Sequence, residues 1–485
     1  MLEKIHHKSA PKEVVNALVT LYRQGKFDDV LSRSSQLIKE YPHTFVLHNI
    51  IGAITFEKGQ KEVAIEHFRQ VIELRPHHPH AYNNLGAALI DIGEYQEAKS
   101  SLQKAIELQP DYAEAYNNLG NVYKEMEEYN QAISSYEKAI ELNPEYYEAL
   151  NNLGAALGKN EQYEEAEKVL NQVIKSQPDF VEALNNLGSI QMCMEKYEEA
   201  KAILNRSIEL YSSNAEALSN LGNVYRKLHE YKHAIDQYKK ALQIKPNYYE
   251  ALNNMGLALT ELEKYSEAKK ILKQAIKINP DSAEAYNSLG LHYETLNEYE
   301  RAVDQYKRAI QIKPNYYEAL NNMGLALTEL KKYSEAENIL KQAIKISPKQ
   351  VQAYSNLGNI YQITEHFHEA IKYYKMALKI NKKIAVIHQN LAYILNSIGD
   401  NKNSIYHQKL AVSLDPNSKV YLQSLLFSLW YDSDLNTKYI FEYHKQYDQK
   451  FGLPHKDKWK AFAQPKTAKE RLKIGYVSPD FRDHS

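Results

Sequence analysis

The chain has 485 residues, with 60 lysines and arginines against 61 aspartates and glutamates. A net charge this close to zero excludes a general electrostatic attraction to nucleic acid or to an anionic membrane. The single cysteine, Cys193, excludes an internal disulfide framework, and no stretch reaches the roughly 20 apolar residues of a membrane span. We therefore expect a soluble, cytoplasmic protein that binds neither nucleic acid nor membrane.

After an N-terminal tail of residues 1–10, glycine recurs every 34 residues. These glycines are Gly52, Gly86, Gly120, Gly154, Gly188, Gly222, Gly256, Gly290, Gly324 and Gly358. Alanine follows each glycine by twelve residues, and proline follows most of them by 24 residues. Glycine and alanine let two helices approach closely, and proline ends the second helix. A fixed period of this length is typical of stacked helix-turn-helix repeats.

These small residues and prolines resemble those of the tetratricopeptide repeat, as twelve repeats over residues 11–418. The first and last repeats are irregular, with Leu18 and Ala392 at the glycine position, and the sequence period stops after Ser418. The resemblance implies an all-α fold, a right-handed superhelical solenoid of about twelve helix-turn-helix repeats. The first helix of each repeat is then expected to line a concave groove.

One face of these first helices carries asparagine, two residues before the glycine. Stacking would align the side chains as a ladder along the groove. The ladder residues are Asn84, Asn118, Asn152, Asn186, Asn220, Asn254, Asn322, Asn356 and Asn390. An amide offers both donors and an acceptor, so the ladder could pair with the backbone of an extended peptide whatever its side chains. We predict a peptide-binding groove here; the alternative is that the amides cross-link adjacent repeats.

Other repeated residues have structural interpretations. A row of glutamates from Glu114 to Glu318 falls in first helical turns, where a carboxylate is favoured by the helix dipole. The tyrosine pairs before the helices, such as Tyr146 and Tyr147, are interpreted as packing between repeats. Neither the histidines nor Cys193 have neighbours at metal-binding or catalytic spacing, so we expect no metal, cofactor or nucleophile in the repeats.

Past Ser418 the chain changes character. Residues 419–468 are predicted to form a helical linker, with apolar helical patterns over 420–431 and 438–451. Residues 469–485 begin with a short apolar run at 472–477 that predicts a strand stub, followed by a loop rich in proline and aspartate.

The C-terminal run Ile474-Gly-Tyr-Val-Ser-Pro-Asp-Phe481, followed by His484, resembles the opening strand and loop of the catalytic region of O-GlcNAc transferases and Spindly-type protein O-glycosyltransferases. In that family a tetratricopeptide superhelix presents proteins to a two-lobed GT-B glycosyltransferase, which transfers a sugar from a UDP carrier to serine or threonine. The resemblance implies that His484 is a catalytic-site residue near the sugar nucleotide. Both lobes would follow Ser485, so we expect neither a UDP-sugar site nor transferase activity in this chain alone.

Two functions are therefore open. The favoured one is the protein-binding arm of an O-GlcNAc transferase-like protein O-glycosyltransferase. The alternative is a free-standing tetratricopeptide adaptor that assembles proteins without chemistry. Both predict proteins or extended peptides as partners in the groove, and both leave open whether the chain forms a homodimer.

Overall fold

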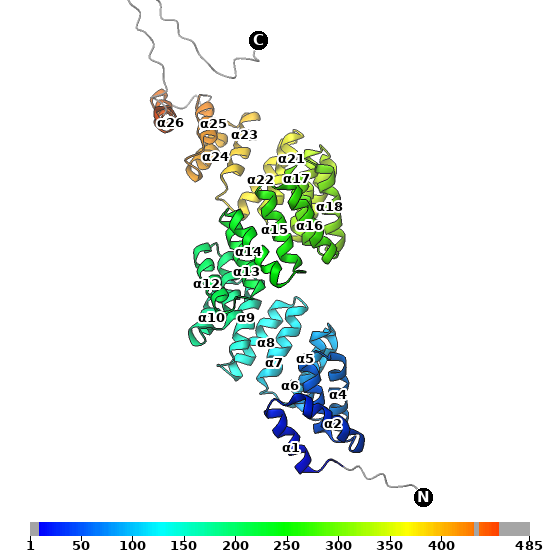
Figure 1. Ribbon diagram of the computed structural model, residues 1–485. Coiled ribbons are helices and arrows are strands. Elements are labelled where there is room, and N and C mark those ends of the chain that lie inside the picture. Colours follow the sequence, from blue (N-terminus) through cyan, green and yellow to red (C-terminus); the bar gives the residue numbers. More distant parts are fainter. Residues whose placement is uncertain (1–8, 431–435, 455–485) are drawn as a thin grey trace, which may run out of the picture. The chain divides into compact units, whose positions relative to one another are not determined.

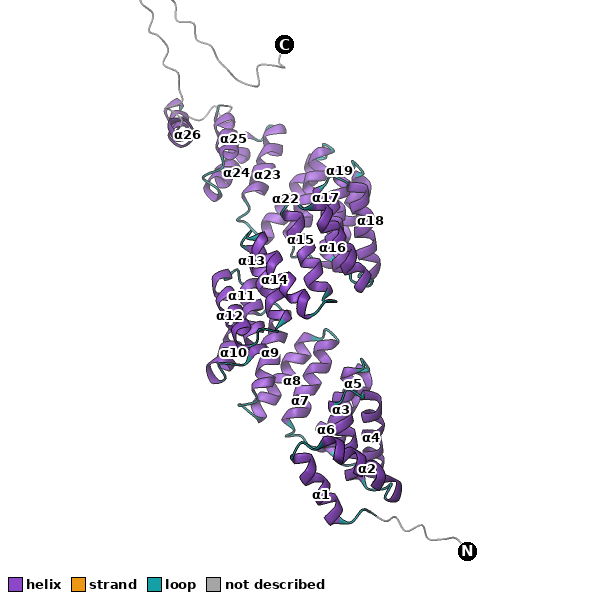
Figure 2. Ribbon diagram, in the orientation of Figure 1, coloured by secondary structure: helices purple, strands orange, loops and turns teal. Residues whose placement is uncertain are grey.

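The computed structural model describes residues 9–430 and 436–454, and every element within these ranges is a helix (Figure 2). The all-α prediction is confirmed. The predicted strand stub at 472–477 and His484 lie outside the described residues.

The chain divides into two compact units, residues 1–280 and 281–485, and Figure 1 labels most of their helices. The helices of the first unit are α1 (Lys12–Arg23), α2 (Phe27–Glu40), α3 (Phe45–Glu57), α4 (Lys61–Leu74), α5 (Pro79–Asp91), α6 (Tyr95–Leu108), α7 (Ala113–Glu125), α8 (Tyr129–Leu142), α9 (Tyr147–Lys159), α10 (Tyr163–Ser176), α11 (Val181–Cys193), α12 (Tyr197–Leu210), α13 (Ala215–Lys227), α14 (Tyr231–Ile244), α15 (Tyr249–Glu261) and α16 (Tyr265–Ile278).

The helices of the second unit are α17 (Ala283–Thr295), α18 (Tyr299–Ile312), α19 (Tyr317–Glu329), α20 (Tyr333–Ile346), α21 (Val351–Ile363), α22 (Phe367–Ile380), α23 (Ala385–Ser397), α24 (Asn401–Leu414), α25 (Lys419–Leu429) and α26 (Thr437–Tyr447). A short π-helical turn, Asp448–Gly452, follows α26.

Small residues in the first helix of each pair make room for a large residue of the second helix. At Gly120, a methyl group on the α-carbon would lie 2.5 Å from the buried ring of Tyr136, which is sixteen residues further along. At Gly154, Leu170 fills the same place, with a corresponding distance of 2.6 Å. Both distances are shorter than van der Waals contact, so only glycine fits. The period of glycine in the sequence thus reflects close helix packing within each pair.

The turn between the two helices of each pair contains one residue with a left-handed backbone. These residues also recur every 34 positions: Gly25, Gly59, Gly93, Glu127, Glu161, Glu195, His229, Glu263, Asn297, Lys331, Glu365 and Gly399. Their φ angles lie between 56° and 83°. Only four are glycine, so eight turns hold a side chain in a conformation that costs roughly 1–2 kcal/mol for residues other than glycine.

The helical spacing extends further than the sequence motif. Helix α25 begins at Lys419, 34 residues after the start of α23 at Ala385, although it has no glycine at the repeat position. Leu425 takes the place of the leucine that precedes glycine elsewhere, and it is fully buried. The predicted linker therefore begins as a further first helix, packed on α24 and α26 through Leu422, Leu425 and Ile440.

The hydrophobic core is a series of clusters along the chain. One cluster contains Tyr136 of α8, Leu153 of α9, Leu170 of α10 and Leu187 of α11. Each cluster is formed by consecutive helices, so each repeat packs against its neighbours in the chain. Candidate binding sites are therefore expected on the surfaces that the repeats present. Within residues 9–430 and 436–454, no helix has both the length and the apolar character needed to cross a membrane.

Candidate peptide-binding face

All nine predicted ladder asparagines lie in the first helix of a pair, and all are partly exposed. In the first unit they are on α5, α7, α9, α11, α13 and α15, and in the second unit on α19, α21 and α23. On each of the two units, we call the surface that carries these asparagines the ladder face. The asparagines of this face lie in the interior of helices, although asparagine is a poor helix former. The packing of the repeats, and not the local preference of asparagine, therefore keeps these segments helical.

In the first unit, ladder asparagines hydrogen-bond to the preceding repeat. Asn118 Nδ2 donates to Asn83 Oδ1 at 2.9 Å, and Asn186 Nδ2 donates to Asn151 Oδ1 at 2.9 Å. The accepting asparagines each stand three residues before a glycine and are buried. Asn152 makes the equivalent bond to Asn117, and the contact from Asn84 to Asn49 is longer, at 3.5 Å.

The second unit repeats this arrangement. Asn322 Nδ2 donates to Asn287 Oδ1 at 3.1 Å, and Asn356 Nδ2 donates to Asn321 Oδ1 at 2.9 Å. Asn390 instead donates to Asn359 at 3.2 Å. These asparagines therefore do cross-link adjacent repeats, as the alternative interpretation predicted, and each uses an N–H of its amide to do so. The sequence analysis missed the accepting residues, although the Asn-Asn pairs in the sequence display them.

Two ladder residues do not join this series. Asn254 accepts a hydrogen bond of 3.5 Å from Asn253 of its own helix. For Asn220, no hydrogen bond to another described residue is recorded; the buried acceptor position one repeat earlier, Asn185, instead accepts from Ser207 at 2.7 Å. The ladder is thus interrupted in the C-terminal part of the first unit.

The hydrogen bonds between repeats leave part of each amide free. The oxygens of Asn118, Asn186 and Asn356 accept no hydrogen bond recorded among the described residues, and their side chains are partly exposed. Each amide also has a second N–H. The same side chain can therefore connect repeats through one N–H and offer an acceptor to a bound backbone.

The glutamate and tyrosine rows agree with their structural interpretations. Glu114, Glu148 and Glu318 are exposed in the first turns of α7, α9 and α19. Burial raises the pKa of Tyr146 and of Tyr248 to about 12. Both hydroxyls therefore remain neutral at physiological pH, as expected for packing residues.

Three further features concern catalytic or metal-binding residues: Cys193, possible metal ligands and His484. Cys193 is a free, exposed thiol at the end of α11. In residues 9–430 and 436–454, no group of three or more His, Cys, Asp and Glu side chains is arranged to hold a metal ion. His484, predicted from the glycosyltransferase resemblance, lies outside these ranges.

Comparisons with known proteins identify the repeat. Residues 113–146 match a tetratricopeptide repeat model, and related repeat models match residues 52–93, 87–127, 135–168 and 156–192. A model described as the cilia and flagella-associated protein 70 C-terminal domain matches residues 179–393. The chain is a tetratricopeptide-repeat protein.

Two solved structures match part of the chain trace. Yeast Tom70 is 15% identical, with 80% of this chain and 96% of that chain covered and a TM-score of 0.48. The APC/C hetero-tetramer Cut9–Hcn1 is 12% identical, with 85% and 95% covered and a TM-score of 0.46. No curated protein sequence matches the chain significantly.

Proposed function

We propose that this chain is a tetratricopeptide scaffold that binds extended segments of partner proteins along its ladder face. The observation that carries the proposal is the series of partly exposed asparagines, most of which are fixed to the preceding repeat through an amide N–H, as Asn118, Asn186, Asn322 and Asn356 are. A fixed amide loses little side-chain entropy when it binds a ligand. Backbone recognition by amides would make the scaffold tolerant of the partner's side chains.

Backbone recognition can be tested with a chemical change in the ligand alone. A peptide of about 12 residues is selected on the full chain, and its affinity is compared with that of an analogue carrying N-methyl groups at alternate residues. N-methylation removes donors to the asparagine oxygens, so we expect affinity to fall at least about tenfold. Equal binding of both peptides would show that side chains, and not the backbone, are recognised.

The second candidate function is the protein-binding arm of a protein O-glycosyltransferase. It is favoured by one observation, the run from Ile474 to Phe481 with His484 after it. The matching family models lie within residues 52–393, so they bear on the repeats alone. Reading the coding sequence on the 3′ side of codon 485 tests this candidate: a continuing GT-B region supports it, and an unrelated gene contradicts it.

A further inference from the structure

The hydrogen-bond pattern of the ladder face ends between α23 and α25. At the position of the buried acceptor asparagine, α23 carries Gln389, and at the next ladder position α25 carries Ser424. A serine has no amide N–H and is too short to replace asparagine. Gln389 Oε1 is buried and has no hydrogen-bond partner among the described residues. The donor that other repeats supply is therefore missing here.

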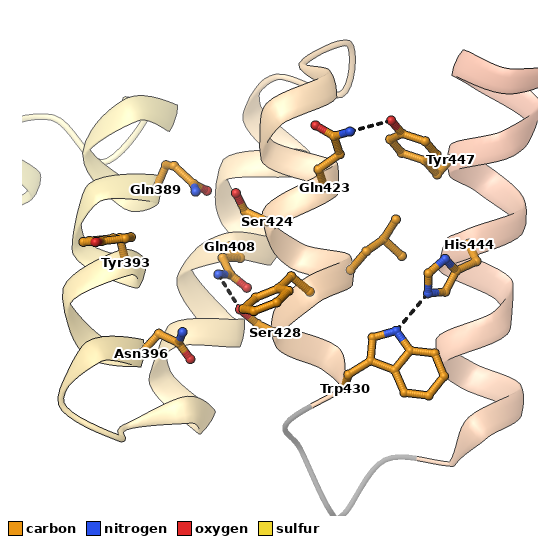
Figure 3. Close-up of a pocket in the computed structure, with 12 residues that line it drawn as sticks. Gln389, Tyr393, Asn396, Gln408, Gln423, Ser424, Ser428, Trp430, His444 and Tyr447 are labelled. Atoms are coloured by element: carbon orange, nitrogen blue, oxygen red, sulfur yellow. Dashed lines mark hydrogen bonds between the residues drawn. The ribbon is translucent and has the colours of Figure 1, made fainter. Parts of the chain in front are cut away.

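A second unpaired oxygen belongs to a residue that lines the same cavity. Gln408 of α24 is only 3% exposed, and its Nε2 donates to Ser428 Oγ at 2.8 Å. Its Oε1 is buried and has no hydrogen-bond partner within residues 9–430 and 436–454. Gln389 and Gln408 both line a cavity of about 840 Å³ formed by α23, α24, α25 and α26 (Figure 3). Buried polar atoms nearly always have a partner, so two unpaired acceptors in one cavity indicate a missing donor.

The same cavity has an aromatic surface. Tyr393 is 58% exposed, Phe427 59% and Trp430 63%. Trp430 Nε1 donates to His444 Nε2 at 3.1 Å, which fixes the indole against α26 (Figure 3). Clustered, exposed apolar side chains of this size are typical of binding sites. The described lining residues include no Asp, Glu, Lys or Arg, so a charged occupant would have no counter-charge.

We propose that this cavity binds an uncharged, extended peptide segment of a partner protein. Apolar side chains of the segment pack against Tyr393, Phe427 and Trp430. Backbone N–H groups of the segment donate to the side-chain oxygens of Gln389 and Gln408, which turn from their buried positions into the cavity. The volume lies within the range of roughly 300–1,000 Å³ that is usual for ligand pockets. The site uses none of the predicted ladder asparagines, so its test does not depend on whether the ladder face binds peptides.

Fluorescence can report on the site directly because the chain has two tryptophans, Trp430 and Trp459. In full-length chain carrying Trp459→Phe, we expect the neutral probe acetyl-Ala-Phe-Ala-amide to produce a saturable change in Trp430 emission. Removing either aromatic contact, by Tyr393→Ala or Phe427→Ala, should weaken binding by about tenfold. The matched control is Tyr406→Ala on α24, because Tyr406 is also 58% exposed but does not line the cavity.

The unpaired oxygens are tested by restoring the missing donor. Ser424→Asn recreates the ladder amide opposite Gln389, so we expect about tenfold weaker probe binding with an unchanged or raised melting temperature. Unchanged affinity in this variant, or equal loss in the Tyr406→Ala control, overturns the proposal. Binding that appears only after residues 455–485 are removed also overturns it, because the occupant would then be the chain itself.

Discussion

The hydroxyl of Tyr136 donates a 2.8 Å hydrogen bond to Asn121 Oδ1, and Asn121 directly follows the glycine against which the tyrosine ring packs. The same pair recurs as Tyr238 with Asn223 and as Tyr374 with Asn359, in both cases at 2.6 Å. Repeats with leucine in place of this tyrosine have alanine, serine or leucine after the glycine. In these three repeats an asparagine after the glycine satisfies the buried hydroxyl. The fourth tyrosine repeat differs: Leu291 follows Gly290, and Tyr306 donates instead to Glu294 at 2.6 Å.

Tyr136→Phe should destabilise the α7–α8 pair by about 1 kcal/mol, because Asn121 loses a donor while the ring volume stays the same. The measurement is the free energy of local opening from hydrogen exchange in α7 and α8. Asn121→Ala should cost less stability in the Tyr136→Phe variant than in the parent, because the hydrogen bond between the two side chains is already lost there. Fully additive losses would show that the pair is not coupled.

The left-handed turn residues give a stabilising prediction. Glu263 has a φ of 62°, a backbone conformation that strains a glutamate because of its Cβ. Glu263→Gly should therefore stabilise the α15–α16 pair by about 0.5–1 kcal/mol, after allowance for the greater chain entropy of glycine. Asn297→Gly is the control and should gain less, since asparagine tolerates this conformation. A loss of protection in α15–α16 on hydrogen exchange would contradict the prediction.

A histidine pair should make the α23–α24 pair sensitive to acid. His388 Nε2 bonds the carbonyl of Lys382 at 3.0 Å and its Nδ1 lies 2.9 Å from Nδ1 of His407. Burial, with further contributions from His388 and Lys375, lowers the pKa of His407 to about 4, against about 6.5 in the unfolded chain. The unfolded state therefore binds the proton first, and stability is complete above pH 6.5 and falls towards pH 4.

The loss should be about 1–2 kcal/mol, since His407 is only half-buried. Hydrogen exchange of α23 and α24 at pH 7.5 and 5.0 measures it, with His407→Gln as the variant in which the pH dependence flattens. An equal pH dependence in the variant and the parent would assign the effect to other groups. The pair His48 and His67, with Nδ1 atoms 3.0 Å apart, offers the same test in α3–α4.

The sequence predicted the helical repeats well because glycine, alanine and proline mark close packing and helix ends at fixed spacing. Helix α25 lacks that glycine, so its place in the repeat could be seen only from the packing of Leu425. The acceptor asparagines were visible in the sequence as Asn-Asn pairs, but their direction towards the preceding repeat depends on how neighbouring helices are placed. The cavity beside Gln389 was not predictable, because it arises from a missing partner across two helices.

We propose that ladder asparagines bind partner backbones as well as connecting repeats. Two triple variants both remove the same three hydrogen bonds between repeats. The ladder variant combines Asn118→Ala, Asn152→Ala and Asn186→Ala, and it also removes the 3.3 Å bond from Asn152 to Asn121. The acceptor variant combines Asn83→Ala, Asn117→Ala and Asn151→Ala, and it changes only buried residues.

The decisive measurement is the affinity of both variants for the peptide selected on the parent chain, with helix content checked by circular dichroism. We expect the ladder variant to lose at least about tenfold in affinity, because each lost hydrogen bond to the ligand contributes roughly 0.5–1.5 kcal/mol. The acceptor variant should lose less affinity than the ladder variant, since its ladder amides remain and only their fixation to the preceding repeat is gone. Equal losses in the two variants would contradict the account and assign the ladder to cross-linking alone.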